Sequence, residues 1–325
     1  MKILARTLCL VLLVSTGLFA QPGVRRRAVA ITVDDLPYAR GSLPTRNDAE
    51  VRRTAEIANR RLLAAFKAHH ALVTGFVIQK GVESLGPTVG TRILRGWITD
   101  GFELGNHTYS HPDINDLPLQ QIEQEILGAD SAIGPLMAQA GKKVSFFRFP
   151  FNHTGNTKLK HDEIAAFLAQ HGYRVATCTI DTSDYIFNNA YVRMLANNDA
   201  SSARRLREEY LAYTSTEIDY YAGLSKQVLG YEPPEVMLLH DNRLNADVIE
   251  EVLLIFEKKQ YQFVSLEAAQ SDAAYQLADT YITQFGPMWG YRWASEHNIK
   301  VNGSSEPDPS KWVTEYGKSP TQQKY

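Results

Sequence analysis

Two histidines four residues apart, His107 and His111, are the strongest chemical signal in this sequence. They follow the apolar-patterned run 101–104, so both leave the end of an expected strand. A four-residue step places two imidazoles on one side of a helical turn, where they can bind one cation. The spacing also arises by chance, and Thr108 stands where zinc proteases carry a glutamate. The pair indicates a metal site only if further ligands lie nearby.

Two adjacent acids, Asp34 and Asp35, supply such ligands. They follow the apolar run 28–33 and are closely followed by Pro37. Adjacent acids at a strand end often serve only as turn or helix-cap residues. One carboxylate with two imidazoles, however, is the ligand set of a catalytic zinc site in which water takes the fourth position. Because neighbouring residues of a strand point in different directions, one acid can bind the cation while the other acts as a base on the water.

Three further apolar runs contain polar residues or lead into them. Runs that are almost continuously apolar are typical of parallel strands buried on both faces. In barrels of alternating strands and helices, active sites are built at the C-terminal ends of such strands. We therefore expect these polar residues to meet the acids and the histidines. The runs are 146–151, which contains Arg148; 174–180, which leads into Asp181 and Asp184; and 235–239, which leads into His240 and Asp241.

The order of the expected elements predicts an α/β barrel. Strands alternate with helices, and such alternation is typical of parallel strands joined by helical crossovers. The expected strands are 28–33, 72–78, 102–107, 145–151, 174–181, 236–240 and 262–264. The expected helices are 48–68, 88–99, 119–139, 158–170 and 245–258, with two more, 201–211 and 217–229, in a long insert.

Aromatic residues of the insert allow two interpretations. They either pack against the barrel or form an aromatic wall along a sugar-binding groove, because flat rings stack on sugar faces. The tyrosines concerned are Tyr210, Tyr213, Tyr220 and Tyr221. The aromatic run 288–293 near the C-terminus likewise either caps the barrel or binds a glycan.

Taken in order, the motifs resemble those of the NodB-homology polysaccharide deacetylases, carbohydrate esterase family four. The matching segments are Thr-Val-Asp-Asp, His-Thr-Tyr-Ser-His-Pro, Arg-Phe-Pro-Phe, Asp-Thr-Ser-Asp-Tyr and Leu-Leu-His-Asp. The resemblance covers about residues 28–269. It implies a distorted, incomplete (β/α) barrel in a domain of residues 21–270, followed by a C-terminal extension, 271–325. The polar stretch past Gly303 is expected to be a poorly ordered tail.

The resemblance also implies a metal centre with a base beside it. Asp34 would be the general base, and Arg148, helped by Asp184, would orient it. The ligands of a divalent metal, zinc in the first place, would be Asp35, His107 and His111.

The remaining roles concern the leaving group and the acyl group. By resemblance, His240 would be the general acid, a role that suits a side chain titrating near neutral pH. The backbone N–H of Phe151 would contribute to the oxyanion site. Leu238 and Tyr185 would bind the substrate by lining the pocket for the acetyl methyl group.

The sequence departs from the pattern of this family in three places, at four residues. Leu36 and Pro37 follow the two acids where glycine is usual, Phe151 replaces a tyrosine, and Tyr185 stands where tryptophan is more usual. None of these is an expected ligand, and the backbone N–H of Phe151 does not depend on its side chain. The departures therefore bear on the choice of substrate more than on the type of reaction.

The expected function is that of a metal-dependent hydrolase that removes acetyl groups from the N-acetylated sugars of a polysaccharide, a chitin-like oligomer or peptidoglycan. Two alternatives stay open. One is an O-acetyl esterase acting on acetylxylan, and the other is a glycan-binding protein that has lost catalysis. A net charge of −2 gives no indication of nucleic-acid binding.

The N-terminus predicts export. Residues 1–20 read as a signal peptide, because Lys2 and Arg6 precede an apolar run, 8–19, that is too short to span a membrane. Secreted or periplasmic location follows, with no stable membrane insertion after cleavage. Cys178 is then the one remaining cysteine, so no intrachain disulfide can form. A glycosylation sequon at 106–108 would place a glycan beside an expected ligand, which favours a bacterial origin.

Overall fold

The computed structural model describes residues 26–41 and 48–318, and the predicted signal peptide lies outside this part of the chain. The described strands are all parallel and form one sheet in the order β5-β4-β3-β2-β1-β6, with β7 also paired to β1. Their bounds are β1 Ala28–Leu36, β2 Val73–Val77, β3 Glu103–Asn106, β4 Phe146–Phe147, β5 Arg174–Val175, β6 Glu235–His240 and β7 Gln262–Phe263.

The sheet curls so far that the chain following β5, at one edge, meets β6 at the other edge. After β5, Ile180 forms a parallel bridge with Met237 of β6. The N–H of Ile180 donates to the carbonyl of Val236 at 3.1 Å, and the N–H of Leu238 donates to the carbonyl of Ile180 at 2.9 Å. A single bridge stands where a closed barrel would have a full strand. The α/β fold is therefore a distorted, incomplete barrel, which confirms the expectation from the sequence.

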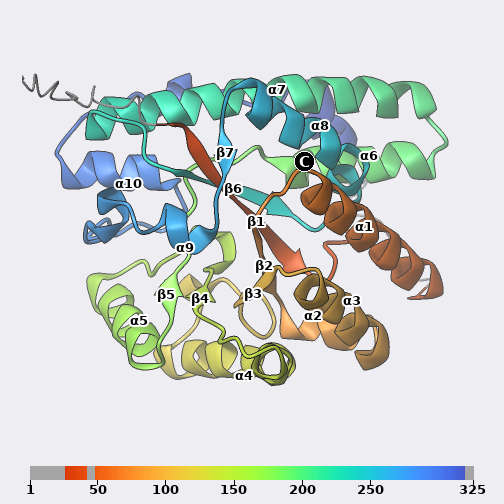
Figure 1. Cartoon of the computed structure of the whole chain (residues 1–325). Coiled ribbons are helices and arrows are strands. Elements are labelled where there is room, and N and C mark those ends of the chain that lie inside the picture. Colours follow the sequence, from red (N-terminus) through yellow and green to blue (C-terminus); the bar gives the residue numbers. More distant parts are fainter. Residues whose placement is uncertain (1–25, 42–47, 319–325) are drawn as a thin grey trace, which may run out of the picture.

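Helices surround the curled sheet (Figure 1). None of the helices in the described part is both long enough and apolar enough to cross a membrane. Three of them, α1, α4 and α5, have the predicted bounds. The helices are α1 Asp48–Ala68, α2 Gln79–Ser84, α3 Pro87–Thr99, α4 Leu119–Gln139, α5 Lys158–Gln170, α6 Asp184–Ala196, α7 Ala200–Leu229, α8 Arg243–Lys258, α9 Leu266–Ala269, α10 Trp289–Glu296 and α11 Lys311–Gly317.

The insert differs from its prediction in two ways. A helix that was not expected, α6, begins directly at Asp184, and α7 is one continuous helix where two were predicted. The residues between the two predicted helices, 212–216, include no glycine or proline, so nothing in them breaks a helix. Tyr210 and Tyr221 are buried, and their hydroxyls donate to Asn245 at 3.0 Å and to Glu306 at 2.6 Å. These contacts favour packing over a sugar-binding wall.

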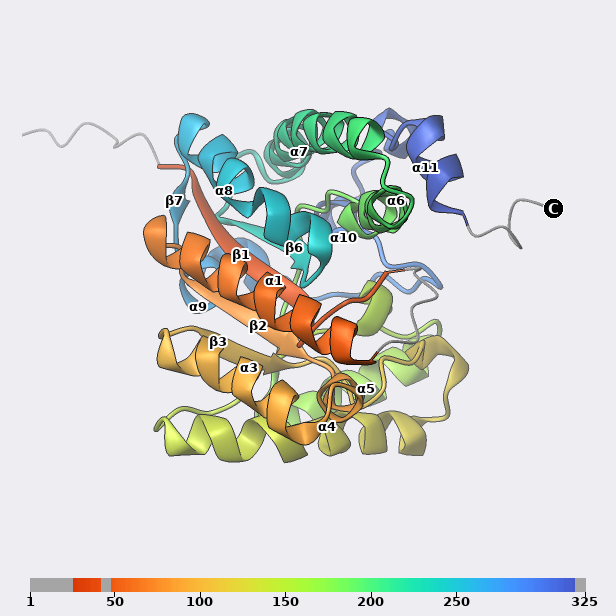
Figure 2. The same ribbon diagram turned by 90° about the vertical axis from the view of Figure 1, so that its right-hand side faces the viewer.

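The predicted poorly ordered tail was wrong for residues up to 318. Helix α11 packs against α6, as Figure 2 shows. Its Val313 is fully buried, and the indole N–H of Trp312 donates to Glu209 of α7 at 2.7 Å. A short apolar helix face is thus enough to hold the described end of the chain on the insert, although the surrounding sequence is polar.

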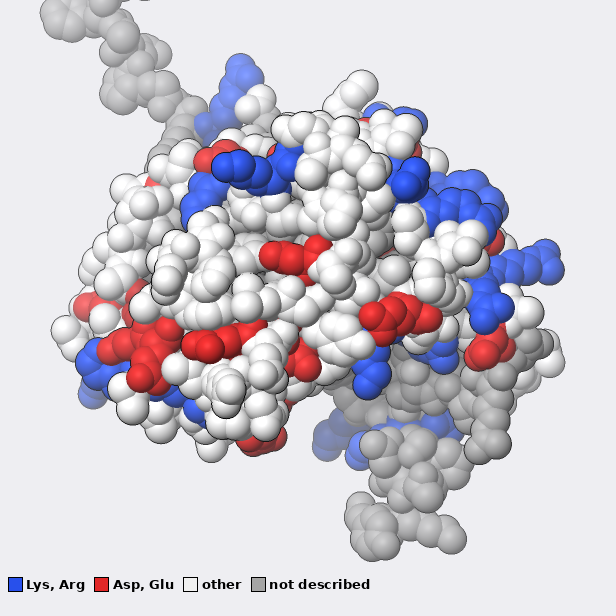
Figure 3. Space-filling model, turned by 90° about the horizontal axis from the view of Figure 1, so that it is seen from below, with Lys and Arg blue, Asp and Glu red and all other residues white. Residues whose placement is uncertain are grey.

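The surface seen from the side of α4 carries charges of both signs (Figure 3). Acidic side chains stand towards the middle of this face, and most lysines and arginines lie nearer its edges. Such mixing accords with the small net charge of −2.

A cluster of aromatic side chains fixes α1 and α3 against the sheet. Trp97 is fully buried and lies with its ring centroid 6.0 Å from Phe66 and 5.8 Å from Phe102. Its indole N–H donates to the side-chain oxygen of Asn59 at 2.7 Å, and the amide of Asn59 donates to the carbonyl of Pro37 at 2.9 Å. The loop that follows the two acids is therefore tied to the core.

Replacing Trp97 with alanine is expected to lower the free energy of unfolding by about 3–5 kcal/mol, because the change leaves a cavity and removes the donor to Asn59. Leu159 is 68% exposed, and Leu159→Ala should change it by less than about 0.5 kcal/mol. Urea denaturation of both variants and the wild type measures the difference. Equal losses in the two variants would contradict the assigned core.

Candidate active site

The end of β1 is irregular where the two acids lie. Its pairing with β2 shifts register between Val33 and Leu36, so Asp34 and Asp35 occupy a bulge. Asp35 has a φ of 64°, which is uncommon for a residue other than glycine. A bulge bends a strand and redirects its side chains. Here it allows both adjacent carboxylates to line one cavity, although a regular strand would point them to opposite faces.

The two histidines meet through a loop, which corrects the expected helical turn. His107 follows β3 directly, and both Thr108 (φ 70°) and His111 (φ 58°) are left-handed. The hydroxyl of Thr108 accepts the N–H of His111 at 2.9 Å, while the side-chain oxygen of Asn106 accepts the N–H of Thr108 at 2.9 Å. These bonds close the loop and bring the two imidazole centroids to 4.9 Å.

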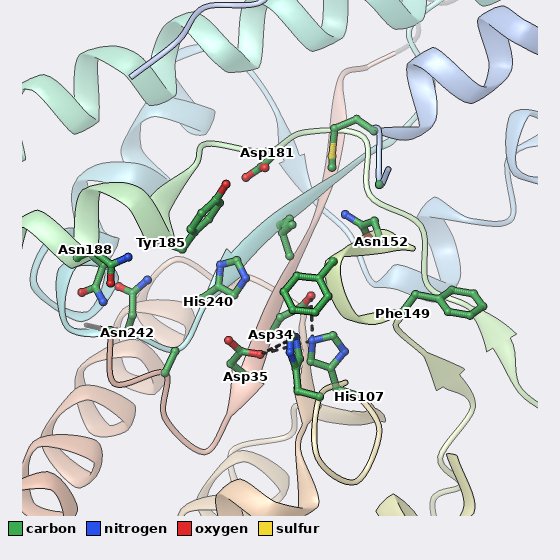
Figure 4. Close-up of a pocket in the computed structure, with 18 residues that line it drawn as sticks. Asp34, Asp35, His107, Phe149, Asn152, Asp181, Tyr185, Asn188, His240 and Asn242 are labelled. Carbon is green, nitrogen blue, oxygen red and sulfur yellow. Dashed lines mark ion pairs between the residues drawn. The ribbon is translucent and has the colours of Figure 1, made fainter. Parts of the chain in front are cut away.

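Asp35, His107 and His111 form one cluster of possible metal ligands. One donor atom from each lies within 4.8 Å of the others. The Nε2 atoms of His107 and His111 lie 3.5 Å and 3.6 Å from Oδ1 of Asp35, which is buried and has no hydrogen-bond partner. The Nδ1–H of His107 donates to the carbonyl of Arg148 at 2.8 Å, so its Nε2 carries the lone pair that a metal needs. Figure 4 shows His107 beside the two acids.

The protonation of this cluster also suits a cation. Burial opposes ionisation of Asp35, but the neighbouring His107 and the other histidines nearby hold its pKa well below the usual value. Burial, together with the neighbouring His107, lowers the pKa of His111 to about 4. At neutral pH the cluster therefore offers a carboxylate and a neutral imidazole, the forms in which these groups bind metals.

Arg148 lies behind Asp34 and is fully buried. Its Nη1 is 3.5 Å from Oδ2 of Asp34, and its Nη2 donates to the hydroxyl of Thr32 at 3.0 Å. Nη1 also donates to the sulfur of Cys178. Burial raises the pKa of Cys178 to about 12, so the thiol remains protonated at neutral pH. The other carboxylate oxygen of Asp34, Oδ1, is buried without a hydrogen-bond partner.

Asp184 accepts hydrogen bonds from His240, which corrects the expectation that Asp184 would assist Arg148. Oδ1 of Asp184 accepts the Nδ1–H of His240 at 2.6 Å, and Oδ2 accepts the backbone N–H of the same residue at 2.8 Å. The side-chain amides of Asn242 and Asn245 also donate to Oδ2. The reason is topological, because α6 begins beside the end of β6 and places Asp184 there.

The Asp184 carboxylate changes the titration of His240. Burial alone would lower the pKa of this histidine, but the charge and hydrogen bond of Asp184, with smaller contributions from Asp35 and Asp34, raise it to about 10. His240 is therefore an imidazolium at neutral pH, a form that can donate a proton. It lies across the cavity from His107 (Figure 4).

One cavity of about 430 Å³ joins these groups. Of the residues predicted to contact substrate, Leu238, Tyr185 and Phe151 all line it. Tyr185 is half exposed, and its ring lies 6.1 Å from that of His240. Phe151 has a φ of 57° and packs its exposed ring 4.7 Å from that of His111.

Asn152 and Met288 line the cavity but were missed by sequence reasoning. Asp181, which was expected at a strand end, lines the cavity as well, and burial raises its pKa to about 6. Asn152 and Met288 are placed by tertiary contacts alone, and Met288 comes from the C-terminal extension.

The other histidines lie outside this cavity. His153 lies two residues past Phe151, but its Nδ1 binds Asp113 at 2.8 Å and it does not line the cavity. His69 lies between two glutamates of α8, at 2.7 and 2.8 Å. His171 is exposed at the end of α5.

Comparison with known proteins identifies the domain. Residues 22–178 match the family model for polysaccharide deacetylase. These residues, just under half of the chain, are similar to a polysaccharide deacetylase domain. The matched segment of the domain includes the two acids, the two histidines, Arg148 and Phe151, whereas Asp184, Leu238 and His240 lie beyond it.

Individual relatives of the deacetylase domain are distant. A curated peptidoglycan-N-acetylglucosamine deacetylase of Bacillus cereus is 24% identical over 125 residues, 38% of this chain and 40% of that protein. The match thus spans less than half of the relative.

Among solved structures, a CE4 family pseudoenzyme from Bacillus anthracis has a TM-score of 0.49 at 14% identity, over 75% of this chain and 66% of that one. A family 4 carbohydrate esterase from Streptomyces lividans, in complex with acetate, has a TM-score of 0.45 at 19% identity, over 75% and 95%.

The link between Asp184 and His240 has a measurable pH signature. The ordinary pKa of histidine is 6.5, and here it is raised to about 10, so the pair stabilises the fold fully below pH 6.5 and this contribution is lost as the pH rises through 10. Asp184→Asn removes the charge responsible and should lower the pKa of His240 by roughly two units or more.

NMR titration of the imidazole signals in metal-free protein tests this expectation. Asp113→Asn, beside His153, is the matched control and should leave the His240 signal unchanged. A His240 that titrates near 6.5 in the wild type would contradict the assigned pair.

Proposed function

We propose that this chain is a metal-dependent hydrolase that removes acetyl groups from N-acetylated sugars of a polysaccharide. The observation that carries the proposal is the convergence, in one cavity, of three possible metal ligands, a neighbouring free carboxylate oxygen and a charged histidine. The match to polysaccharide deacetylases supports the class of substrate. Chitin-like oligomers and peptidoglycan are the substrates we infer, and the predicted signal peptide supports a secreted or periplasmic enzyme of bacterial origin.

The three ligands fit a divalent metal, and zinc in particular. Two imidazole nitrogens and one carboxylate oxygen are the donor set of open catalytic zinc sites. Oδ1 of Asp35 is a buried acceptor without a donor, which a cation would satisfy. When bound, the metal would act as a Lewis acid that polarises the amide carbonyl and lowers the pKa of a bound water.

Asp34 takes the role of general base in this proposal. Its free Oδ1 belongs to the cavity wall, adjacent in sequence to the ligand Asp35, and can accept the proton of an attacking water. Arg148, which itself donates to Thr32, holds the other oxygen of the carboxylate in place.

His240 takes the role of general acid. An amine is a poor leaving group unless it is protonated, and general acids of this kind contribute about 10²–10⁴-fold to a rate. Asp184 keeps His240 charged and fixes its ring, so that Nε2 is the atom that delivers the proton. After the reaction, Asp34 holds one proton and His240 lacks one, and exchange with water restores both.

The remaining groups receive the rest of the acetamide. The backbone N–H of Phe151 would donate to the oxygen that becomes negative in the tetrahedral intermediate. Leu238, buried at the cavity wall, and Tyr185 would contact the acetyl methyl group. Phe151 places its own ring against His111, where it can exclude water from the ligand cluster.

The proposal is tested by acetate release from N-acetylglucosamine oligomers, peptidoglycan and acetylxylan. We expect release that stops on chelation and returns with zinc. Asp34→Asn should lower kcat by about 10²–10⁴-fold while the protein keeps its metal. Asp113→Asn, an acid of the neighbouring loop that does not line the cavity, serves as the control and should be as active as the wild type.

Two results would reject this function. Release that persists without metal would remove the metal-dependent mechanism. Tight metal binding without acetate release from any of the polymers would favour a glycan-binding protein or a different acyl substrate.

The leaving group separates amide hydrolysis from ester hydrolysis. An alcohol departs with less protonation than an amine, so His240→Asn should abolish most activity on N-acetylglucosamine oligomers and retain more on acetylxylan. His171→Asn, at an exposed histidine, is the control. Rates on the two substrates that fall by the same factor in His240→Asn would contradict the role of general acid. A wild type active on acetylxylan alone would identify an O-acetyl esterase.

A further inference from the structure

The C-terminal extension, residues 271–318 of the described chain, reaches into the proposed active site. Gly286 and Met288 line the same cavity as the two acids and His240. The backbone N–H of Trp289 donates to the carbonyl of Cys178 at 2.8 Å, beside Arg148. The match to the family model ends at residue 178, so the C-terminal extension lies outside the matched part of the chain.

The turn that carries Phe151 is conformationally demanding. Phe151 and Asn152 have φ values of 57° and 54°, two successive left-handed residues that are not glycine. Such a backbone conformation is unfavourable for these residues and persists only where the surroundings fix it. Two bonds from within the turn, Asn152 N–H to Phe149 and His153 N–H to Pro150, both at 3.1 Å, close it locally.

Arg292 of α10 fixes this turn from outside. The side chain is buried, with 1% of its surface exposed. Its Nη2 donates to the carbonyl of Asn152 at 3.1 Å, and its Nη1 donates to the hydroxyl of Thr154 at 3.0 Å. Asp279 neutralises the guanidinium at 2.8 Å, and the ring of Trp289 lies 4.7 Å from its central carbon. Asp279 and Trp289 therefore hold the guanidinium in place, and it binds the turn through two hydrogen bonds.

Gly286 covers the same turn at close range. A Cβ atom at this position would lie 1.8 Å from the carbonyl oxygen of Phe151, so no side chain fits there without a shift of the backbone. The extension thus contacts the carbonyls of both left-handed residues, Phe151 through Gly286 and Asn152 through Arg292.

We propose that Arg292 is a positioning residue for the deacetylase reaction, acting through the Phe151–Asn152 turn whose Phe151 N–H is the oxyanion donor. The inference rests on the proposed function. It requires no contact between Arg292 and substrate or metal. Loss of an oxyanion donor costs about 10²–10³-fold in rate, and a turn that retains its local bonds but loses Arg292 should cost part of that, roughly ten- to a hundredfold in kcat.

The test compares Arg292→Gln, Arg292→Lys and Gly286→Ala with the wild type. Arg61→Gln, at an exposed arginine paired with Asp247, is the matched control. We expect Arg292→Gln and Gly286→Ala to lower kcat with little change in KM and with full zinc content. Arg292→Lys should recover part of the rate, because an ammonium keeps the charge for Asp279 but cannot reach both acceptors.

A second measurement does not depend on activity. Hydrogen–deuterium exchange of the peptide spanning residues 149–155 should be faster in Arg292→Gln than in the wild type and Arg61→Gln, while a peptide from β1 is unchanged. Unchanged exchange, or a fall in kcat matched by equal loss of zinc or of the folded state, would overturn the inference. If the wild type releases no acetate, the proposed function fails. Faster exchange confined to residues 149–155 would then still support Arg292 as the residue that holds the turn.

Discussion

The site depends on one buried cation, the guanidinium of Arg148. It is fully removed from solvent, and such a charge is costly unless it is paired and hydrogen-bonded. Asp34 and Thr32 on β1 and Cys178 beyond β5 provide its partners. Its own carbonyl fixes the tautomer of His107. A single residue thus joins the proposed base, one possible ligand and the segment that nearly closes the barrel, so changes to this residue should affect both the fold and the site.

The two sides of the cavity keep their titratable groups in opposite protonation states. On the side of β1 and β3, the nearby histidines keep Asp35 charged against the effect of burial, and burial keeps His111 neutral. On the side of β6, Asp184 keeps His240 charged. Groups that can accept a proton and groups that can donate one coexist at the same pH, because separate neighbouring residues set the protonation state of each. The sheet supplies the partners, since both sets stand at the C-terminal ends of neighbouring strands.

Strand-end chemistry was the part of the site that the sequence predicted well. Parallel strands bring their C-terminal ends together whatever the details of packing. The convergence of motifs far apart in sequence can therefore be predicted from the pattern of strands. The exact partners were less predictable. Asp184 was expected to assist Arg148, but helix α6, which was not predicted, begins at Asp184 and places it beside β6. The segment between His107 and His111 was expected to form a helical turn. It is a loop instead, defined by left-handed residues and by the hydrogen bond of the Thr108 hydroxyl.

Long-range packing explains what the sequence did not reveal. The break predicted between 211 and 217 is absent, because no glycine or proline interrupts α7 there. The order of α11 comes from one buried valine and one indole hydrogen bond to α7. Met288 and Arg292 carry no local signature of a role in the site, because their significance arises only where the extension meets the third motif.

The contact between Arg292 and Asn152 spans 140 residues of sequence. Contacts of such separation require the closure of long loops and form slowly compared with local structure. All five motifs lie before residue 242, so they can be synthesised and begin to assemble while the arginine that secures the turn is still missing. Completion of the turn that carries Phe151 is thereby tied to the last quarter of the chain. A protein truncated after its motifs would keep the proposed base, acid and metal ligands, but this turn would be held only by its local hydrogen bonds.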